Sequence, residues 1–235
     1  MIALSFDTSA KVATVAVLDG EKTLASYSID NGLTQSELIL PMAENMLSAL
    51  KLSLDDVGLL CTSVGPGSFT GVRIGVSLVK GLAFGRNIPC VPVSTIEALS
   101  ENLRGLQGVI VPVMDARRNQ VYTATFLSEG DKLTRLTEDR AISLSELAEE
   151  LREYTDEDIY LVGDGYGVAK RALTGMGIRI SDTPYELRNE NAASVGRVGV
   201  RKYEAGEWVK ETEISPVYLR LPQAERERLE RLGNN

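Results

Sequence analysis

The chain has 235 residues, 43% of them hydrophobic and 25% charged, an ordinary globular composition that suits one large domain or two small ones. Its net charge of −8 leaves no basic surface for binding nucleic acid without a partner. It contains no histidine, which excludes histidine-based metal sites and both the Ser-His-Asp and the Cys-His nucleophile systems.

The N-terminal residues do not predict export. The acidic Asp7 follows Met1 too closely for a secretory signal peptide, and no basic residue precedes it. No apolar run approaches the ~18 residues that cross a bilayer. Cys61 and Cys90 stand alone in apolar runs, as buried free thiols do in a reducing compartment. We therefore predict a cytoplasmic protein that makes no membrane contact.

The first hundred residues predict an α/β unit with apolar strands, two long helices and a glycine-rich turn between the fourth strand and the second helix. The expected elements are strands at 4–9, 13–18 and 23–29, a helix at 34–50, a strand at 57–63, a helix at 70–84, a strand at 88–93 and a short helix at 95–103. The helix at 34–50 opens with the spacing of a capping box.

The same order of elements begins again after residue 108. A strand at 109–114 ends in Asp115, as the first strand ends in Asp7, and Gly163-Asp164-Gly165 repeats the turn at Gly65-Pro66-Gly67. Two copies of one α/β unit explain this order best. The further expected elements are strands at 121–127, 133–137 and 159–162, a helix to about 154, a late helix at 190–205 and a strand or extended segment at 214–219.

The turn at Gly65-Pro66-Gly67 has the setting of a phosphate loop but not its spacing. Gly65, Gly67 and Gly71 are spaced one residue too widely for the dinucleotide fingerprint, and no Gly-Lys-Ser/Thr follows for a P-loop. A phosphate contact and a plain strand-to-helix turn both remain open on this pattern.

The two long helices carry more apolar and small residues than one buried face needs. The helix at 34–50 is apolar well beyond a stripe of about 100°. The helix at 70–84 contains glycines four residues apart, although each costs about 1 kcal/mol relative to alanine. Packing within the lobe and contact with another subunit both explain this, and we predict some of each. The predicted interface residues are Leu38, Ile39, Met42, Met46, Gly71, Gly75, Leu78 and Leu82.

Several motifs together resemble one protein family over nearly the whole chain. They are Asp7-Thr8-Ser9, the glycine block at 65–75, Asp115-Ala116-Arg117-Arg118 and Pro216-Val217-Tyr218-Leu219-Arg220. They look like the bacterial TsaB (YeaZ) family of the actin/Hsp70/sugar-kinase superfamily. The resemblance implies two tandem ribonuclease-H-like lobes with mixed sheets flanked by helices. We place an N-terminal lobe with the dimerisation helices at 1–105, a C-terminal lobe at 106–222 and a charged tail at 223–235.

The resemblance also implies a function. Members of this family are non-catalytic partner subunits in forming N6-threonylcarbamoyladenosine at position 37 of tRNAs that read ANN codons. The implied partners are the metal-bearing paralogue TsaD, the ATPase TsaE and a second copy of the chain. The protein is then expected to have no catalytic residue, metal site or cofactor of its own, with ATP and metal on the partner subunits and tRNA bound only through the complex. The balance between homodimer and heterodimer stays open.

The alternative is a small-molecule kinase or ATPase of the same superfamily. Those enzymes close on phosphates with a glycine hairpin after each acidic strand end, where this chain has larger side chains. We expect at most a weak nucleotide contact completed by a partner's surface, through Asp7, Thr8, Ser9 and Arg117. A glycoprotease-like peptidase is less favoured, because the metal-bearing paralogues hold their ion with a histidine pair that this chain lacks.

Overall fold

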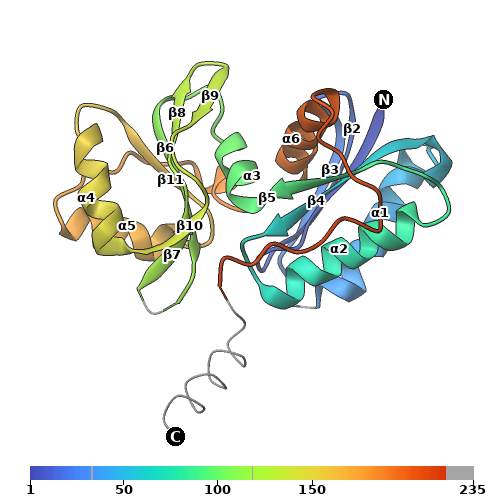
Figure 1. Ribbon diagram of the computed structural model, residues 1–235, viewed down its shortest axis with the longest axis horizontal. Helices are drawn as coiled ribbons and strands as arrows, with labels where there is room; N and C mark the ends of the chain where they lie inside the picture. Colours follow the sequence, from blue (N-terminus) through green and yellow to red (C-terminus); the bar gives the residue numbers. More distant parts are fainter. Residues whose placement is uncertain (33, 118, 221–235) are drawn as a thin grey trace, which may run out of the picture.

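The computed structural model describes residues 1–32, 34–117 and 119–220. Two lobes lie side by side, each built on a sheet with helices on both faces (Figure 1). The predicted α/β fold class with two lobes is therefore confirmed. The predicted charged tail at 223–235 lies outside the described residues.

The N-terminal lobe is a mixed sheet with the strand order β3-β2-β1-β4-β5. Short turns join the antiparallel strands β1, β2 and β3, whereas β1, β4 and β5 run parallel and need helical crossovers. The elements of this half are β1 (Ile2–Asp7), β2 (Ala13–Asp19), β3 (Lys22–Ile29), α1 (Gln35–Ala49), β4 (Val57–Gly65), α2 (Phe69–Ala83), β5 (Cys90–Ser94) and α3 (Thr95–Glu101).

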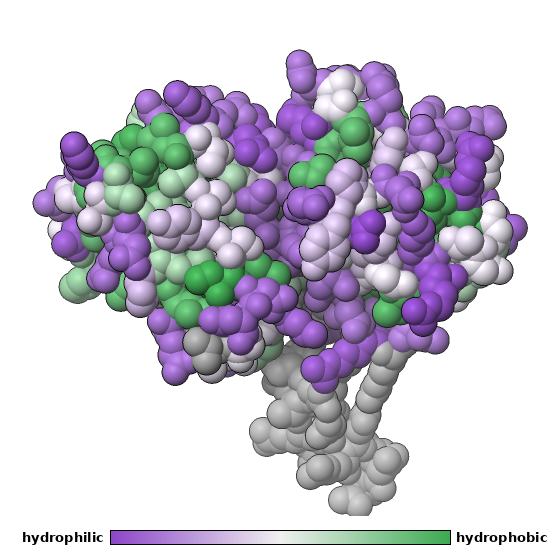
Figure 2. All heavy atoms as spheres, turned by 180° about the vertical axis from the view of Figure 1, so that it is seen from behind, coloured by the Kyte–Doolittle hydropathy of each residue, from purple (hydrophilic) through white to green (hydrophobic). Residues whose placement is uncertain are grey.

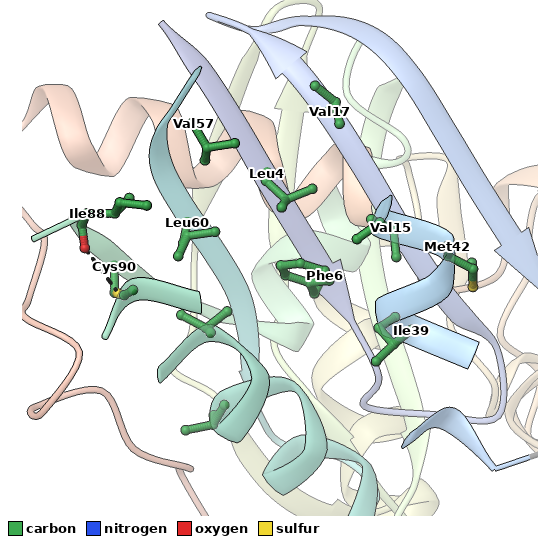
Figure 3. Packing of buried hydrophobic residues seen from close by; sticks show 14 of the residues in the cluster. Leu4, Phe6, Val15, Val17, Ile39, Met42, Val57, Leu60, Ile88 and Cys90 are labelled. Carbon is green, nitrogen blue, oxygen red and sulfur yellow. Dashed lines mark hydrogen bonds between the residues drawn. The ribbon is translucent and has the colours of Figure 1, made fainter. Parts of the chain in front are cut away.

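One face of this sheet packs against α1 and α2. Alternate residues of β1, Leu4 and Phe6, point to this face beside Val15 of β2, as the two-residue period of a strand requires (Figure 3). Ile39 and Met42 of α1 cover them. The core of the lobe therefore lies directly under the two helices predicted to contact another subunit.

The C-terminal lobe repeats the plan with shorter strands. Its α4 and α5 pack against one face of the sheet. The elements are β6 (Gln107–Asp115), β7 (Gln120–Thr123), β8 (Phe126–Glu129), β9 (Lys132–Arg135), β10 (Arg140–Ser143), α4 (Leu144–Leu151), β11 (Ile159–Val162), α5 (Tyr166–Gly175) and α6 (Ala192–Glu204).

The prediction of one strand at 121–127 is wrong, because the segment forms β7 and β8 with a break between them. Both pair with β6 in one continuous antiparallel register, with Val113 opposite Thr123 and Ile110 opposite Phe126. The break falls opposite Pro112, which has no N–H to donate to the ladder. The Thr123 hydroxyl instead donates to the Pro112 carbonyl at 2.7 Å.

Each lobe lends a helix to the other. Helix α3 follows the last strand of the first sheet but packs its Ile96 and Leu99 against Phe126 of the second sheet. Helix α6 lies beyond the predicted boundary at residue 105, yet it packs on the first sheet, on the face opposite α1 and α2 (Figure 1). A side chain at Gly196 of α6 would overlap Leu18, so glycine allows this close approach. The strands before residue 105 form the first sheet and those after it form the second, whereas α3 and α6 each pack against the sheet of the other lobe.

The residues predicted as a strand or extended segment at 214–219 form no regular strand within the described part.

The described helices include none with both the length and the apolar content needed to cross a membrane.

Candidate functional site

The Asp7 carboxylate at the end of β1 accepts hydrogen bonds from residues of its own lobe. Asp7 is 1% exposed. Its Oδ1 accepts hydrogen bonds from the Ser9 N–H at 2.8 Å and the Ser9 hydroxyl at 2.6 Å, and its Oδ2 accepts one from the Ser63 hydroxyl at 2.6 Å. Burial raises the pKa of Asp7, and the bonds from Ser63 and Ser9 oppose that rise. This acid therefore ties β1 to β4.

Thr8 and Ser9 join β1 to the start of α2. The Thr8 hydroxyl donates to the Gly71 carbonyl at 2.7 Å, and the Ser9 carbonyl accepts from the Ser68 N–H at 2.6 Å. Both Thr8 and Ser9 are buried. Three of the four residues predicted to contact a nucleotide are thus held inside the N-terminal lobe.

The glycine turns close on neighbouring backbone. A Cβ at Gly67 would lie 2.5 Å from the Ser9 carbonyl oxygen, and a Cβ at Gly65 would overlap the Val217 carbonyl. In the second lobe, a Cβ at Gly165 would lie 2.9 Å from the Val113 carbonyl oxygen. The room that these glycines leave is occupied by the chain itself, which favours plain strand-to-helix turns over phosphate loops.

A cavity of about 400 Å³ lies between the lobes. Of the four residues predicted to contact a nucleotide, Arg117 is the one that lines it. Arg117 is exposed in the turn between β6 and β7, with a φ of 62° and its N–H donating to Asp115 Oδ1 at 2.7 Å. The other lining residues are Pro66, Gly67, Ser68, Phe69, Thr70, Met114, Asp115, Ala116, Tyr122, Val217, Tyr218, Leu219 and Arg220.

The last described residues form one wall of this cavity. The Val217 N–H donates to the Val64 carbonyl at 2.7 Å. The Tyr218 ring stacks on Phe69 with 4.3 Å between centroids, and its hydroxyl accepts from Arg73 Nε at 2.9 Å. The family-like motif at 216–220 therefore holds the chain end against the start of α2, a role that the sequence pattern did not reveal.

Arg220 continues this segment onto the other lobe. Its guanidinium donates to the Ala116 carbonyl at 3.0 Å and also to Gln120 Oε1. It lies 5.8 Å from the centroid of the Tyr122 ring. The segment at 214–220 thus fastens the two lobes to each other beside the cavity.

Three of the predicted interface residues are already buried within the chain. Ile39, Met42 and Met46 are at most 4% exposed and belong to the core of the N-terminal lobe. Met42 and Met46 present almost no surface to a partner, whereas Ile39 lines a groove on the outer side of the helices. The prediction treated every apolar residue beyond one stripe as surplus, but α1 packs on the sheet and also contacts α2, so it buries a wider face. Leu38, Leu78 and Leu82 are half-buried.

Gly71 and Gly75 show the packing within the lobe that the sequence predicted, and their contact with another subunit stays a prediction. A Cβ at Gly71 would overlap the Thr8 carbonyl oxygen. One at Gly75 would lie 2.7 Å from the Thr8 hydroxyl and 2.8 Å from the Thr62 hydroxyl. Both glycines let α2 approach β1 and β4 of its own lobe. Gly81 differs, because a Cβ there would meet no atom within 4 Å among the described residues considered.

The outer side of α1 and α2 carries two shallow grooves. One, of about 490 Å³, includes Leu40 and Leu82, and the other, of about 470 Å³, includes Leu40, Ile74 and Leu78. Leu40 is 39% exposed. From behind, hydrophobic side chains form several patches on the N-terminal lobe, at the left of Figure 2. Among the described residues, no three His, Cys, Asp or Glu side chains are arranged to hold a metal ion.

Comparisons with known proteins agree on one family. Residues 34–227 match the family model described as TsaD, tRNA N6-adenosine threonylcarbamoyltransferase. The Bacillus subtilis tRNA threonylcarbamoyladenosine biosynthesis protein TsaB is 30% identical over 226 residues, which cover 96% of each chain. The Escherichia coli TsaB protein is 27% identical over 219 residues, covering 92% of this chain and 94% of its own.

A solved structure agrees with these sequence matches. It is an uncharacterized Pseudomonas aeruginosa protein with similarity to the peptidase YeaZ. It superposes with a TM-score of 0.77 at 25% identity, covering 93% of this chain and 99% of its own.

Proposed function

This chain belongs to the TsaB family of tRNA threonylcarbamoyladenosine biosynthesis proteins, and we propose that it serves that modification as a non-catalytic partner subunit. Its proposed partners are a metal-bearing TsaD-like paralogue, which performs the transfer, and a TsaE-like ATPase. The tRNA is bound through the complex, and ATP and metal belong to the partner subunits. The observation that supports a non-catalytic role is the buried Asp7 carboxylate, whose two oxygens are already hydrogen-bonded to Ser9 and Ser63 of the same chain.

The proposed partner surface is the outer side of α1 and α2. Ile74, Ser77 and Leu78 line one of its grooves. Gly81 follows Leu78 by three residues, Ser77 by four and Ile74 by seven, and so lies on the same side of the helix. No described neighbour requires a glycine at Gly81. An exposed helical glycine with no packing role in its own chain fits close approach by the backbone of a second subunit. Of the predicted interface residues, Ile39 and Leu78 line one groove and Leu82 lines the other.

Reconstitution tests the proposal directly. The purified chain is combined with its metal-bearing paralogue, the ATPase, tRNA and threonylcarbamoyl-adenylate, and each protein is omitted in turn. Modified tRNA is expected when this chain and the paralogue are both present, and not with this chain alone. ATP hydrolysis or small-molecule phosphorylation by the isolated chain would overturn the proposal and favour the kinase alternative.

Replacing Gly81 by Gln is expected to weaken assembly while stabilising the folded monomer. The side chain enters open space in the monomer, and a better helix former raises the free energy of unfolding by about 0.5–1 kcal/mol. On a close helix contact the same side chain is expected to lower affinity for the paralogue or a second copy by about tenfold or more. Light scattering and a binding titration measure the mass and the affinity.

Gly167→Gln on α5 is the matched control, because a Cβ at Gly167 would also have no neighbouring chain atom within 4 Å among the described residues. It is expected to leave assembly unchanged. Equal affinities for the two variants would place the partner surface elsewhere on the molecule.

A further inference from the structure

Glu190 is a buried carboxyl group at the junction of the two lobes. It is 3% exposed, and neither of its side-chain oxygens has a hydrogen-bond partner among the described residues. Nearly all buried polar groups in folded proteins are paired, and an unpaired buried charge is costly. The position therefore requires a physical explanation that packing alone does not supply.

The backbone around Glu190 is tied to both lobes. On one side, the Arg188 carbonyl accepts from the Gly163 N–H of the C-terminal lobe at 2.6 Å. On the other, the Ala192 N–H donates to the Thr14 hydroxyl of the N-terminal lobe at 3.0 Å. Asn102, just after α3, donates to the Asn189 carbonyl at 2.8 Å. Residues 188–192 thus form a linker that crosses the junction, with Glu190 at its centre.

Acidic groups from both lobes act on this carboxyl. The charges of Asp7 at the end of β1 and of Asp164 in the turn before α5 both raise the pKa of Glu190. Asp164 is exposed and in turn faces Asp115 and Lys11. Glu101, the neighbour of Asn102 in the chain, forms ion pairs with Arg104, Arg197 and Arg201, which balance its charge.

Burial raises the pKa of Glu190 well above its ordinary value, and the charges of Asp7 and Asp164 add to the rise. Asp7 keeps three hydrogen-bond donors, which stabilise its charged form. Of Asp7 and Glu190, only Glu190 lacks hydrogen-bond donors that would stabilise its charged form, so Glu190 is the group that keeps a proton.

We propose that Glu190 is a neutral carboxylic acid that lets the lobes stay closed, and that loss of its proton to solvent loosens the junction. An ionised carboxylate at this position needs water, and water reaches it only if the linker at 188–192 moves away from Asp7 and Asp164. The opening and closing of the junction is then a pH-sensitive equilibrium. This inference is independent of the function proposed above.

The sign of the pH dependence follows from the raised pKa. The folded chain holds its proton more tightly than the unfolded chain does, so this group's stabilisation is complete below the ordinary pKa of a glutamate. It is lost as pH rises through the folded-state pKa. Each unit of difference between the two pKa values lowers the folding constant tenfold. Asp7, with a raised pKa, contributes in the same direction.

The test compares wild type with Glu190→Gln from about pH 5 to about pH 8. The amide stays neutral, so the difference in stability between variant and wild type is expected to grow as pH rises. At the upper end, the amide protons of Gly163 and Ala192 are expected to exchange faster in wild type than in the variant at the same pH. A matched control on the same segment is Glu186→Gln, whose side chain is exposed and is expected to change neither measurement.

Asp164→Asn provides the second arm, because this exposed residue can be changed without filling or emptying the core. Removing its charge lowers the pKa of Glu190, so the fall in stability with pH is expected to be smaller than in wild type. Parallel pH profiles for wild type, Glu190→Gln and Asp164→Asn would overturn the proposal. So would an equal effect from Glu186→Gln.

Discussion

Replacing Glu101 by Ala is expected to lower the free energy of unfolding by about 1.5–3 kcal/mol, because three partly buried arginine side chains lose the carboxylate that they share. The Glu101 side chain is 1% exposed. It accepts from Arg104 Nε at 2.8 Å, from Arg197 Nε at 3.3 Å and from Arg201 at 2.7 Å. Arg104 also donates to the Asp131 carbonyl of the second lobe. The carboxylate therefore links α3, α6 and the C-terminal lobe.

Glu97→Ala is the matched control for this variant. Glu97 lies one turn earlier on α3 and pairs with Lys202 at 3.4 Å and Arg135 at 4.0 Å, but its side chain is 28% exposed. Partly solvated pairs of this kind contribute about 0–1 kcal/mol. Urea unfolding of both variants measures the difference. A loss from Glu101→Ala no larger than that from Glu97→Ala would show that water replaces the carboxylate around the arginines.

Gly71→Ala is expected to lower the free energy of unfolding by about 3 kcal/mol or more. The added methyl group would overlap the Thr8 carbonyl oxygen, which is backbone and cannot rotate away. Relief requires α2 to move off β1, which also breaks the hydrogen bond from the Thr8 hydroxyl to the Gly71 carbonyl. Gly75→Ala is expected to cost less, about 1–2 kcal/mol, because it meets the hydroxyl groups of Thr8 and Thr62.

Gly81→Ala on the same helix distinguishes packing from helix propensity. Its methyl group would have no neighbouring chain atom within 4 Å among the described residues, so the change is expected to raise the free energy of unfolding by about 0.5–1 kcal/mol. Thermal and urea unfolding measure all three variants. A Gly71→Ala chain that is as stable as wild type but fails to bind the proposed paralogue would instead show that Gly71 is an interface residue.

Much of the architecture was predictable because it depends on neighbouring residues. Leu4 and Phe6 alternate with smaller residues along the predicted strand β1, and Thr34 and Glu37 form the predicted capping box at the start of α1. The repeated order of elements indicated two lobes. The break at Pro112 was missed, although the missing N–H was visible, because its effect appears only in the partner strand.

The candidate site was only partly predictable. The sequence placed Asp7 at a strand end, but its role depends on Ser63, which lies 56 residues away in the chain. It also flagged Gly71 and Gly75 as small residues on one side of a helix, without showing that Thr8 fills the space beside them. The glycine spacing predicts that another segment packs closely against the helix, but it does not indicate whether that segment belongs to the same chain or to a partner.

Most of the elements, their duplicated order and the family-like motifs could be predicted from side-chain periodicity and turn residues over a few positions. Which helix covers which sheet, which arginines surround Glu101 and where Glu190 is buried depend on packing between distant segments. Glu101 pairs with Arg201 across 100 residues of chain, and the charge of Asp7, near the other end of the chain, raises the pKa of Glu190. Such contacts arise when distant segments pack together, and no local pattern carries their distance or their burial.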